Sequence, residues 1–575
     1  MAQTNLHPIQ DSVFLNYLQA NYPEILSNDS LLTQETFGIE VLNLDGLGLT
    51  NIDGIHHFSD LNILRCNDNY LTDLPDLPIN LKNLECNDNQ LSFLPNLPDS
   101  LNILFCQNNQ LLSLPELPES INIIECSNNQ LSILPNLPDS LTILKCKNNN
   151  LNTLPELPSR ISNLKCDYNQ LFNLPTLPND IDILECDNNY LTFLPNLPYG
   201  ISVLECNDNY LTSLPELPNS INTIVCDNNF LTSLPQLPIN LNFICCDNNN
   251  ISSLPELPHS INTFECNDNN LTTLPELPDS LNTLECNDND LTILPELPDG
   301  LNTLECNDND LIILPELPDG LNTLECNDND LTILPEFPDG LNTLECNDND
   351  LTILPELPDG LNTLECNDND LTILPELPDG LNTLECNDND LTILPELPDG
   401  LNTLECNDND LTILPNLPNS LDELNFLFNP ITCLTNYHPL FLELINYPIC
   451  IYGCTDTLSC NFNPLALIED STCIYSEIYY DCYGECINDF DLDGVCDELD
   501  NCIDESNADQ LDDDSDGEGD ACDYDDGIGI VELNKKLPAL IKMVDVLGRE
   551  QQEHKKGSLL FYIYDNGKVE KKFNT

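Results

Sequence analysis

Residues 281–300 read LNTLECNDNDLTILPELPDG, and this unit recurs almost unchanged every 20 residues through the copy that begins at Leu401. Looser copies run back to about Leu61. A fixed period of this length indicates a solenoid, in which each repeat forms one coil that packs on its neighbours.

One coil follows the pattern L-x-x-L-x-C-x-x-N-x-L-x-x-L-P-x-L-P. Residues around Leu284 alternate with period two, which predicts a short strand. The Leu-Pro steps cannot continue a helix, because proline lacks the N–H donor and fixes φ. The other side of the coil is therefore expected to be extended or polyproline-like. The expected core residues of the unit are Leu281, Leu284, Cys286, Leu291 and Leu294.

An asparagine, Asn289 in this unit, recurs from Asn69 to Asn409. If it is buried, it can donate to and accept from the turn backbones of neighbouring coils. The whole pattern is that of leucine-rich repeats, and the two Leu-Pro steps resemble the repeats of bacterial secreted effectors. The resemblance covers about two thirds of the chain. It implies a solenoid with parallel strands on its concave face and an irregular convex face.

The chain has 575 residues and a net charge of −85. Acidity of this size argues against binding to nucleic acid or to an anionic membrane surface. No membrane span is expected, because no apolar run is long enough. No signal peptide is visible, but Ala2-Gln3-Thr4 resembles the residues around a signal-peptidase cut. We therefore expect that a leader is missing from the sequence or has been removed.

The 29 cysteines form two classes. Eighteen form a row in the repeats, from Cys66 to Cys406, with Cys245 beside it. They are expected to fill a core position as small apolar side chains. Disulfides between adjacent coils and metal thiolates are the alternatives, because parallel strands ~4.8 Å apart lie within disulfide range. The ten from Cys433 to Cys522 resemble an extracellular disulfide framework.

On the strand face, Thr283, Glu285 and Asn287 are expected to point to the concave side, with Asp288 and Asp290 at its rim. The coils from Leu281 to about Gly400 are nearly identical, and we call them the uniform coils. In them each side chain stacks on its own copy. Carboxylates ~5 Å apart repel by ~0.8 kcal/mol per pair in water, so a ladder of Glu285 copies needs counterions. The face is either a solvated acidic surface suited to high salt or a cation-loaded binding surface.

Coils before residue 270 are more mixed, and they are the better candidate for binding a specific partner, because aromatic and basic residues make strong anchors. The Glu285 row there contains Arg65, Phe105, Lys145, Lys165, Val225 and Cys245, and the Asp290 row contains Tyr70, Tyr190, Tyr210 and Phe230.

Both ends of the array are expected to be capped, because a solenoid otherwise exposes its core. Asp11-Ser12 predicts a helix start, with the helix running through Leu26 and Val13, Phe14, Tyr17 and Leu18 on one face. In the atypical first coil, Leu44 and Leu47 replace the cysteine and the asparagine. In the last coil Phe426 replaces the cysteine and Asn429 keeps the ladder. Cys433 and Cys450 are placed so that a bridge between them would pin a C-terminal cap.

Residues 453–475 begin GCTDTLSCNFNPLALIEDSTC. This stretch resembles a short cysteine-rich motif of secreted Bacteroidota proteins, with Phe462 in place of a tyrosine. A disulfide-stapled spacer is its expected role.

The strongest chemical signal lies in residues 489–523, where two loops share one spacing. When position 1 is Asp489 in the first loop and Asp512 in the second, oxygen ligands fall at positions 1, 3, 5, 7, 9 and 12. The ligand at position 7 is the backbone carbonyl. Position 6 is a glycine, Gly494 or Gly517. This spacing wraps hard oxygen ligands around one Ca²⁺ ion. The predicted ligands are Asp489, Asp491, Asp493, Val495, Asp497 and Asp500 in the first loop, and Asp512, Asp514, Asp516, Glu518, Asp520 and Asp523 in the second.

An EF-hand is not expected, because each loop ends in Asp and no helices flank it. The segment instead resembles the thrombospondin type 3 repeat, on Asp500-Asn501-Cys502, Asn507, Gln510 and residues 519–523, GDACD. Ile503 departs from that family's usual proline. The resemblance implies calcium held by aspartates, a core of ions and disulfides, and a bridge between Cys502 and Cys522. An acidic disordered linker is the alternative.

The tail is basic, with nine of the 15 Lys and Arg residues after Val531. IKMVDVLGRE (541–550) and LLFYIYDNGKVEKKF (559–573) predict strands, and Asn566-Gly567 suits a hairpin turn. The tail closely resembles the C-terminal sorting domain of type IX secretion cargo in Bacteroidota. That family implies export across the outer membrane, removal of the tail, and release or attachment to surface lipopolysaccharide. A small β-module without a sorting role is the alternative.

No nucleophile elbow, phosphate loop or histidine row occurs, so we predict no enzymatic activity. Six segments are predicted: a helical cap with the first coil (1–60), the repeats (61–430), a C-terminal cap (431–452), the cysteine-rich module (453–475), the calcium-binding repeat (476–526) and the sorting domain (527–575). The predicted protein is secreted or displayed at the cell surface and recognises a protein or polysaccharide through its concave face. A structural or cation-sequestering surface-layer component is the alternative.

Overall fold

The computed structural model describes residues 6–441, 446–524, 540–545, 550–551, 558–564 and 568–574. The chain divides into two compact units, Met1–Ile449 and Cys450–Thr575. Among the described residues, no helix has both the length and the apolar character needed to cross a membrane.

The N-terminal cap consists of β1 (Leu6–Pro8), α1 (Ser12–Asn21), the 3-10 turn η1 (Pro23–Ile25), β2 (Leu26–Ser27) and β3 (Ser30–Leu32). Asp11 is the predicted N-cap, and its carboxylate accepts N–H groups of Val13 and Phe14. Its other oxygen accepts the backbone N–H and the hydroxyl of Thr50, which joins the helix to the first coil.

The predicted end of this helix was wrong. The helix ends at Asn21 rather than Leu26, because Pro23 has no N–H to continue the hydrogen-bond pattern. Phe14 and Leu18 are buried as expected, whereas Val13 is exposed.

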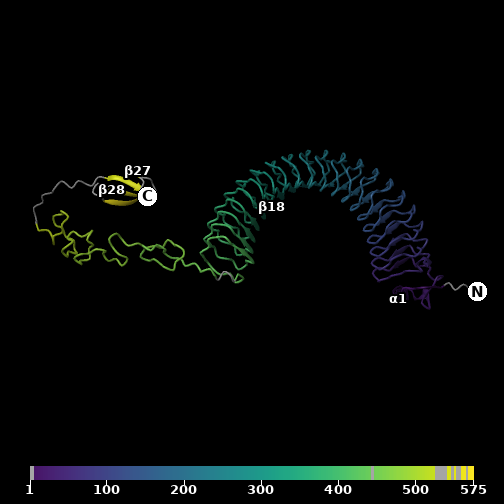
Figure 1. The fold of residues 1–575 in the computed structure, drawn as a ribbon, viewed down its shortest axis with the longest axis horizontal. Helices are drawn as coiled ribbons and strands as arrows, with labels where there is room; N and C mark the ends of the chain where they lie inside the picture. The colour runs from purple at the N-terminus through teal and green to yellow at the C-terminus, as the bar shows by residue number, and fades with distance from the viewer. Residues whose placement is uncertain are drawn as a thin grey trace, which may run out of the picture. The chain divides into compact units, whose positions relative to one another are not determined.

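The rest of this unit is a solenoid whose coils stack along an arc, with the strands on its inner side (Figure 1). Each coil adds one three-residue strand to a parallel sheet. From β5 (Ile63–Arg65) onward the register is 20 residues, as Leu284 opposite Leu304 illustrates, whereas Leu42 of the first coil lies opposite Leu64, 22 residues on. The fold is therefore the predicted parallel-strand solenoid. The strands are β4 (Val41–Asn43), β5 (Ile63–Arg65), β6 (Asn83–Glu85), β7 (Ile103–Phe105), β8 (Ile123–Glu125), β9 (Ile143–Lys145), β10 (Asn163–Lys165), β11 (Ile183–Glu185), β12 (Val203–Glu205), β13 (Thr223–Val225), β14 (Phe243–Cys245), β15 (Thr263–Glu265), β16 (Thr283–Glu285), β17 (Thr303–Glu305), β18 (Thr323–Glu325), β19 (Thr343–Glu345), β20 (Thr363–Glu365), β21 (Thr383–Glu385), β22 (Thr403–Glu405) and β24 (Glu423–Asn425).

The asparagine row joins every coil to the one before it. Asn289 Nδ2 donates to the carbonyls of Cys266, Cys286 and Asn287, and Asn289 Oδ1 accepts the N–H of Leu271. Two of these four partners belong to the preceding coil. The side chain is 9% exposed, so the predicted buried ladder is confirmed.

The cysteine row is a column of free, buried thiols, as predicted. Cys286 Sγ lies 3.5 Å from the carbonyl oxygen of Glu305 in the next coil and donates to it. Burial raises the pKa of Cys286 to about 12, so the thiol stays protonated and unreactive.

Between Asn287 and Asn289, the backbone of each coil turns through the left-handed region, with φ of +50° at Asp288. Asn and Asp tolerate this conformation better than other non-glycine residues. The row of Asp288 copies therefore has a conformational role in the turn.

The convex side of the coils is extended, and within residues 61–441 the structure contains no helix. A 3-10 turn, η2 (Ile55–His57), lies in the first coil. In the last coil Asn429 Nδ2 donates to the Cys406 carbonyl at 2.7 Å, which continues the ladder as predicted. Two short strands, β23 (Ile413–Leu414) and β25 (Cys433–Leu434), pair beside it, and Cys433 and Cys450 are both disulfide-bonded.

The second unit is rich in disulfides and turns. Its bridges join Cys454 to Cys473, Cys460 to Cys482, Cys486 to Cys496 and Cys502 to Cys522. The bridge from Cys460 to Cys482 crosses the predicted boundary at residue 475.

The tail forms an antiparallel sheet in the order β27 (Glu550–Gln551), β26 (Leu540–Asp545), β28 (Ser558–Tyr564) and β29 (Val569–Asn574). The stretch 541–550 was predicted to be a strand, but it contains most of β26 and the first residue of β27, which pair antiparallel. The stretch 559–573 contains most of β28 and of β29, as predicted, and Asn566-Gly567 lies outside the described residues.

Replacing Asn289 with Leu should destabilise the solenoid by about 2–5 kcal/mol, because it leaves the Leu271 N–H and buried carbonyls without partners. Denaturant unfolding followed by circular dichroism measures the loss. Thr292→Ala, at an exposed position of the same coil, is the control. An Asn289→Leu effect no larger than that of the control would show that the ladder is dispensable.

Candidate recognition face and candidate calcium loops

The first predicted calcium loop is folded around its own carboxylates. Asp489 Oδ2 accepts the N–H of Gly494 at 3.0 Å, and Asp497 Oδ1 accepts the N–H of Phe490 at 2.7 Å. Asp493 Oδ1 accepts the N–H of Val495 at 2.8 Å. Gly494 has φ of +92°, which provides the sharp turn expected at position 6.

The second loop repeats these three contacts. Asp512 Oδ2 accepts the N–H of Gly517 at 3.0 Å, and Asp520 Oδ1 accepts the N–H of Asp513 at 2.7 Å. Asp516 Oδ1 accepts the N–H of Glu518 at 2.9 Å. Two stretches of different sequence therefore adopt one loop conformation.

In each loop the first three predicted carboxylates come together. One oxygen from each of Asp489, Asp491 and Asp493 lies within 4.8 Å of the others, and the same holds for the group Asp512, Asp514 and Asp516. The other predicted ligands are not in these groups: Val495, Asp497, Asp500 and Asp523 are partly buried, and Glu518 and Asp520 are exposed.

Two carboxylate oxygens of the first loop, Asp491 Oδ2 and Asp500 Oδ2, are buried without a hydrogen-bond partner. Loss of hydration and the neighbouring Asp493 raise the pKa of Asp491. Buried acceptors without donors need a counter-charge, and a cluster of carboxylate oxygens is the donor set that Ca²⁺ prefers. The residues present therefore fit a hard divalent cation.

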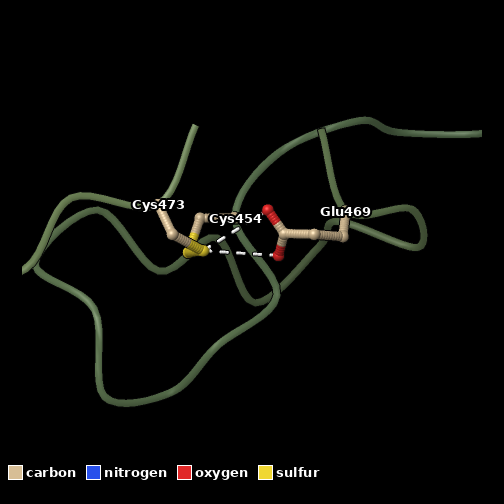
Figure 2. Close-up of side chains that lie close together, drawn as sticks. All are labelled: Cys454, Glu469 and Cys473. Atoms are coloured by element: carbon tan, nitrogen blue, oxygen red, sulfur yellow. Dashed lines mark hydrogen bonds between the residues drawn. A yellow bond between two sulfur atoms is a disulfide. The ribbon is translucent and has the colours of Figure 1, made fainter. Parts of the chain in front are cut away.

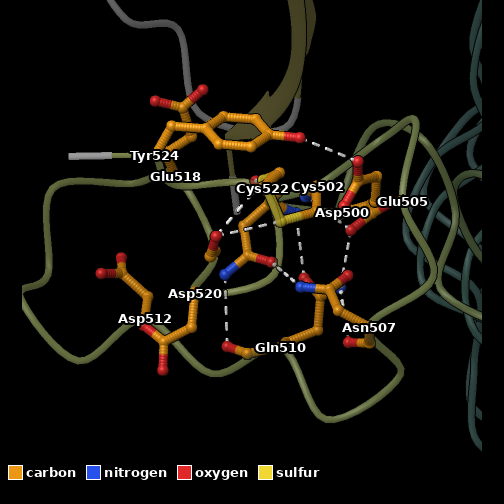
Figure 3. The surroundings of a disulfide bond; sticks show 12 residues. Asp500, Cys502, Glu505, Asn507, Gln510, Asp512, Glu518, Asp520, Cys522 and Tyr524 are labelled. Atoms are coloured by element: carbon orange, nitrogen blue, oxygen red, sulfur yellow. Dashed lines mark hydrogen bonds between the residues drawn. A yellow bond between two sulfur atoms is a disulfide. The ribbon is translucent and has the colours of Figure 1, made fainter. Parts of the chain in front are cut away.

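The Cys502–Cys522 disulfide joins the two loops, as the resemblance implied, with a Cα–Cα distance of 5.5 Å (Figure 3). Around it, Asn507 Nδ2 donates to Asn501 Oδ1, and Gln510 Nε2 donates to Asp500 Oδ1. A Cβ on Gly519 would lie 2.4 Å from Asn501 Oδ1, so only glycine fits there. The matched Asn, Gln and Gly residues of the motif therefore build the joint between the loops.

A third cluster, Cys454, Glu469 and Cys473, is not a metal site (Figure 2). The two sulfurs are bonded to each other, so neither is a free thiolate ligand. Glu469 accepts the N–H and the hydroxyl of Thr455, which anchors a turn of the module.

On the concave face of the uniform coils, the Glu285 copies stack in register, as predicted. Hydrogen bonds between these glutamates and the neighbouring row of Asn287 copies were not predicted from the sequence. Asn287 Nδ2 donates to Glu305 Oε2 at 3.3 Å, and Asn287 Oδ1 accepts the N–H of Asn307 at 2.8 Å. The bond to Glu305 offsets part of the repulsion between the stacked glutamates. From the sequence, this repulsion was expected to require counterions.

Burial, together with the remaining repulsion, raises the pKa of several glutamates in the row. Burial, with the charges of Glu305 and Glu265, raises the pKa of Glu285 to about 7. In the earlier coils, burial and Asp167 raise the pKa of Asp187 to about 7 as well.

The earlier coils contain a lysine cluster, Lys145, Lys147 and Lys165, beside a hollow of about 530 Å³. Lys147 Nζ lies 2.6 Å from Asp167 Oδ2, and both Lys147 and Lys165 bind the Glu185 carboxylate. Burial alone would raise the pKa of Glu185, but the hydrogen bonds from these lysines lower it.

Lys147 was missed by the sequence reasoning. It stands two residues after Lys145 on the same strand face, and this spacing is the signal that would have found it.

Three residues of the predicted aromatic row, Tyr190, Tyr210 and Phe230, form a stack along the rim, whereas Tyr70 lies in a distant coil. The ring centroids of Tyr190 and Tyr210, and those of Tyr210 and Phe230, lie 6.0 Å apart. Phe172 continues the stack at 5.5 Å from Tyr190. Tyr190, Tyr210, Phe230 and Tyr168 line a hollow of about 590 Å³ whose other walls are mainly asparagine side chains; we call it the rim hollow.

No family model and no curated protein matches the chain. Among solved structures, YopM from Yersinia enterocolitica is 36% identical and aligns over 67% of this chain and 91% of its own, with a TM-score of 0.63. The chain belongs to the leucine-rich repeat family. YopM from Yersinia pestis, described as a leucine-rich effector protein, is 35% identical over 56% of this chain and 87% of its own, with a TM-score of 0.48.

The leucine-rich repeats should become less stable as pH rises from about 4 to about 7. A carboxyl whose pKa is higher in the folded than in the unfolded chain binds its proton more tightly when folded, so its ionisation opposes folding. Asp187→Asn removes this charge and keeps the oxygen that accepts the Asn207 N–H. It should raise stability at pH 8 by at least about 1.4 kcal/mol, the equivalent of one pKa unit.

Thermal unfolding from pH 4 to pH 8 measures this effect, which should grow with pH and level off above pH 7. Asp180→Asn, at an exposed position of the same coil, is the control. A gain that does not depend on pH would contradict the titration of Asp187.

Proposed function

We propose that this protein is a non-enzymatic recognition or adhesion protein, which binds a protein or polysaccharide through residues 61–270 of its leucine-rich repeats. The observation that carries the proposal is the exposed aromatic stack in the rim hollow. Tyr190, Tyr210 and Phe230 are 41%, 49% and 50% exposed, although large aromatic side chains are usually buried.

The chemistry of the rim hollow supports binding of a partner. Tyrosine and phenylalanine provide rigid apolar contact area at small entropic cost, and the surrounding amides both donate and accept hydrogen bonds. The lysine cluster on the adjacent concave face adds fixed charges of both signs, which favours orientation of a partner. A leucine-rich repeat solenoid presents these groups on rigid coils, so little entropy is lost on binding.

The segment with the calcium loops is proposed as a calcium-dependent stalk. The paired loop conformations, the clustered carboxylates and the two unpartnered buried oxygens support this assignment. Ca²⁺ would be held by the aspartates of each loop and would cancel their mutual repulsion, so ion binding and ordering of the segment are coupled.

Export to the outer cell surface is part of the same proposal. The disulfides of the second unit favour an oxidising, extracellular compartment. The tail residues that resemble a type IX sorting domain would direct export, with possible attachment to lipopolysaccharide after their removal. No nucleic-acid partner is proposed for a chain with a net charge of −85.

A structural or cation-sequestering role is the second candidate, and the uniform coils favour it. From Glu285 to Glu405 the acidic row is unbroken, and no aromatic side chain interrupts the rim at these positions. Such a face would bind many cations weakly, whereas the two loops would bind few cations tightly.

Calcium titration of the full chain by calorimetry should show two or more tight sites that are lost in a variant with Asp491→Asn and Asp514→Asn. Each substitution removes a clustered carboxylate charge and keeps the size of the side chain. The matched control carries Asp504→Asn and Asp509→Asn, at exposed positions outside the loop ligands. Equal losses in both variants, or no tight sites in the unaltered chain, would leave an acidic linker instead of a stalk.

Binding of the full chain to arrayed glycans and to immobilised extracellular proteins tests recognition. A variant with Tyr190→Ala, Tyr210→Ala and Phe230→Ala should lose at least about tenfold in affinity, because central aromatic anchors contribute most of the binding energy. The control variant replaces Ile293, Ile313 and Ile333 with Ala, three exposed apolar residues away from the rim hollow. Binding that survives the aromatic substitutions would refute this site. Weak binding of many Ca²⁺ ions without any partner would favour the structural role.

A further inference from the structure

Three histidines that are far apart in the sequence meet at the N-terminal cap. His7 lies in β1, whereas His56 and His57 lie in η2 of the first coil. The ring centroid of His7 is 5.0 Å from that of His57 and 5.7 Å from that of His56. Asp53 joins the group, with its Oδ2 atom 3.3 Å from His7 Nε2.

The contact between His7 and Asp53 is close but is not a hydrogen bond. His7 Nε2 is buried and makes no hydrogen bond, although Asp53 Oδ2 is 3.3 Å away. Two ligand atoms that each lie ~2.05 Å from a tetrahedral Zn²⁺ ion are ~3.3 Å apart. The pair therefore stands at the spacing of two ligands of one ion.

The histidine rings fit the same test. Two imidazoles on one tetrahedral Zn²⁺ have centroids ~5 Å apart, when ~2.05 Å bonds and the size of the ring are combined. His7 and His57 meet this spacing at 5.0 Å, whereas His56 and His57, at 3.9 Å, are too close to be ligands of one ion. The spacings are therefore compatible with His7, His57 and Asp53 as ligands of one Zn²⁺ ion.

The backbone holds these groups in place. Gly54 has φ of +98°, and a Cβ there would lie 2.9 Å from His7 Cδ2, so the glycine both makes the turn and admits the ring. The N–H of Gly54 donates to Asp53 Oδ1, which leaves Asp53 Oδ2 free to bind an ion together with His7 Nε2. The buried Thr36 hydroxyl donates to the carbonyl of His57 at 2.6 Å. Outer hydrogen bonds of this kind orient metal ligands.

We propose that His7, His57 and Asp53 form a Zn²⁺ site that clamps the N-terminal cap to the first coil. In this structure the ligand atoms of the three residues do not all lie within 4.8 Å of one another, so the site requires the His57 ring to turn until one nitrogen approaches His7 Nε2 and Asp53 Oδ2. Water takes the fourth position. Imidazole and carboxylate together suit Zn²⁺, in contrast to the all-oxygen calcium loops. The site is independent of the proposed recognition and calcium functions.

Zinc-dependent protection of histidines in the full chain tests the proposal. The chain, saturated with Ca²⁺, is treated with diethyl pyrocarbonate with and without Zn²⁺, and mass spectrometry reads the modification of each histidine. Zn²⁺ should protect His7 and His57 at least about tenfold, because a coordinated nitrogen has no lone pair for the reagent. His259, exposed on a later coil, is the internal control and should not change.

Thermal unfolding of variants gives the second readout. Zn²⁺ should raise the unfolding temperature of the unaltered chain and of His259→Gln, because a ligand that binds only the folded cap stabilises it. The rise should be absent in Asp53→Asn and His57→Gln. Equal protection of His7, His57 and His259, or a zinc-induced rise that survives both substitutions, would overturn the site and leave a structural contact between His7 and Asp53.

Discussion

The hydrogen bonds of the buried asparagine row are the interaction on which the solenoid depends. Each amide satisfies carbonyls in its own coil and a carbonyl and an N–H in the preceding coil, as Asn289 does with Cys266 and Leu271. These partners are backbone groups that the short strands leave unpaired. Because the amide reaches only one coil, neighbouring coils must follow closely similar paths, and from β5 onward they also have the same length. The fixed 20-residue register of the sheet follows from this constraint.

A fixed register places each side chain on its counterpart in the next coil, so like groups stack on like. This is neutral for the leucines and thiols of the core and unfavourable for carboxylates. The uniform coils compensate with the amides of the Asn287 row, whereas the earlier coils interrupt the acidic row with Lys145 and Lys165. The same register also makes an aromatic stack possible, because Tyr190, Tyr210 and Phe230 are one coil apart.

The sequence was sufficient for features that depend on the period. The buried leucines, the free thiols, the asparagine ladder and the Asp11 cap follow from spacing and residue type, and so does the loop conformation around Gly494 and Gly517. Features that depend on how far a side chain reaches were not predictable in this way. The bond from Asn287 to Glu305 joins two different rows, and His7 meets His57 across 50 residues of non-repeating sequence. The early end of α1 was readable from Pro23 but was overlooked.

The acidity of the chain has two different structural settings. In the solenoid, carboxylates stand one coil apart, and several of them receive side-chain amides or lysines, which offset part of their repulsion. Within the described residues, only the two loops bring three carboxylates within 4.8 Å of one another. Their backbone donors satisfy one side of each carboxylate, yet oxygens of Asp491 and Asp500 remain buried and unpartnered. The close clustering of carboxylates is therefore a local property of the loops, and it does not follow from the net charge of the chain.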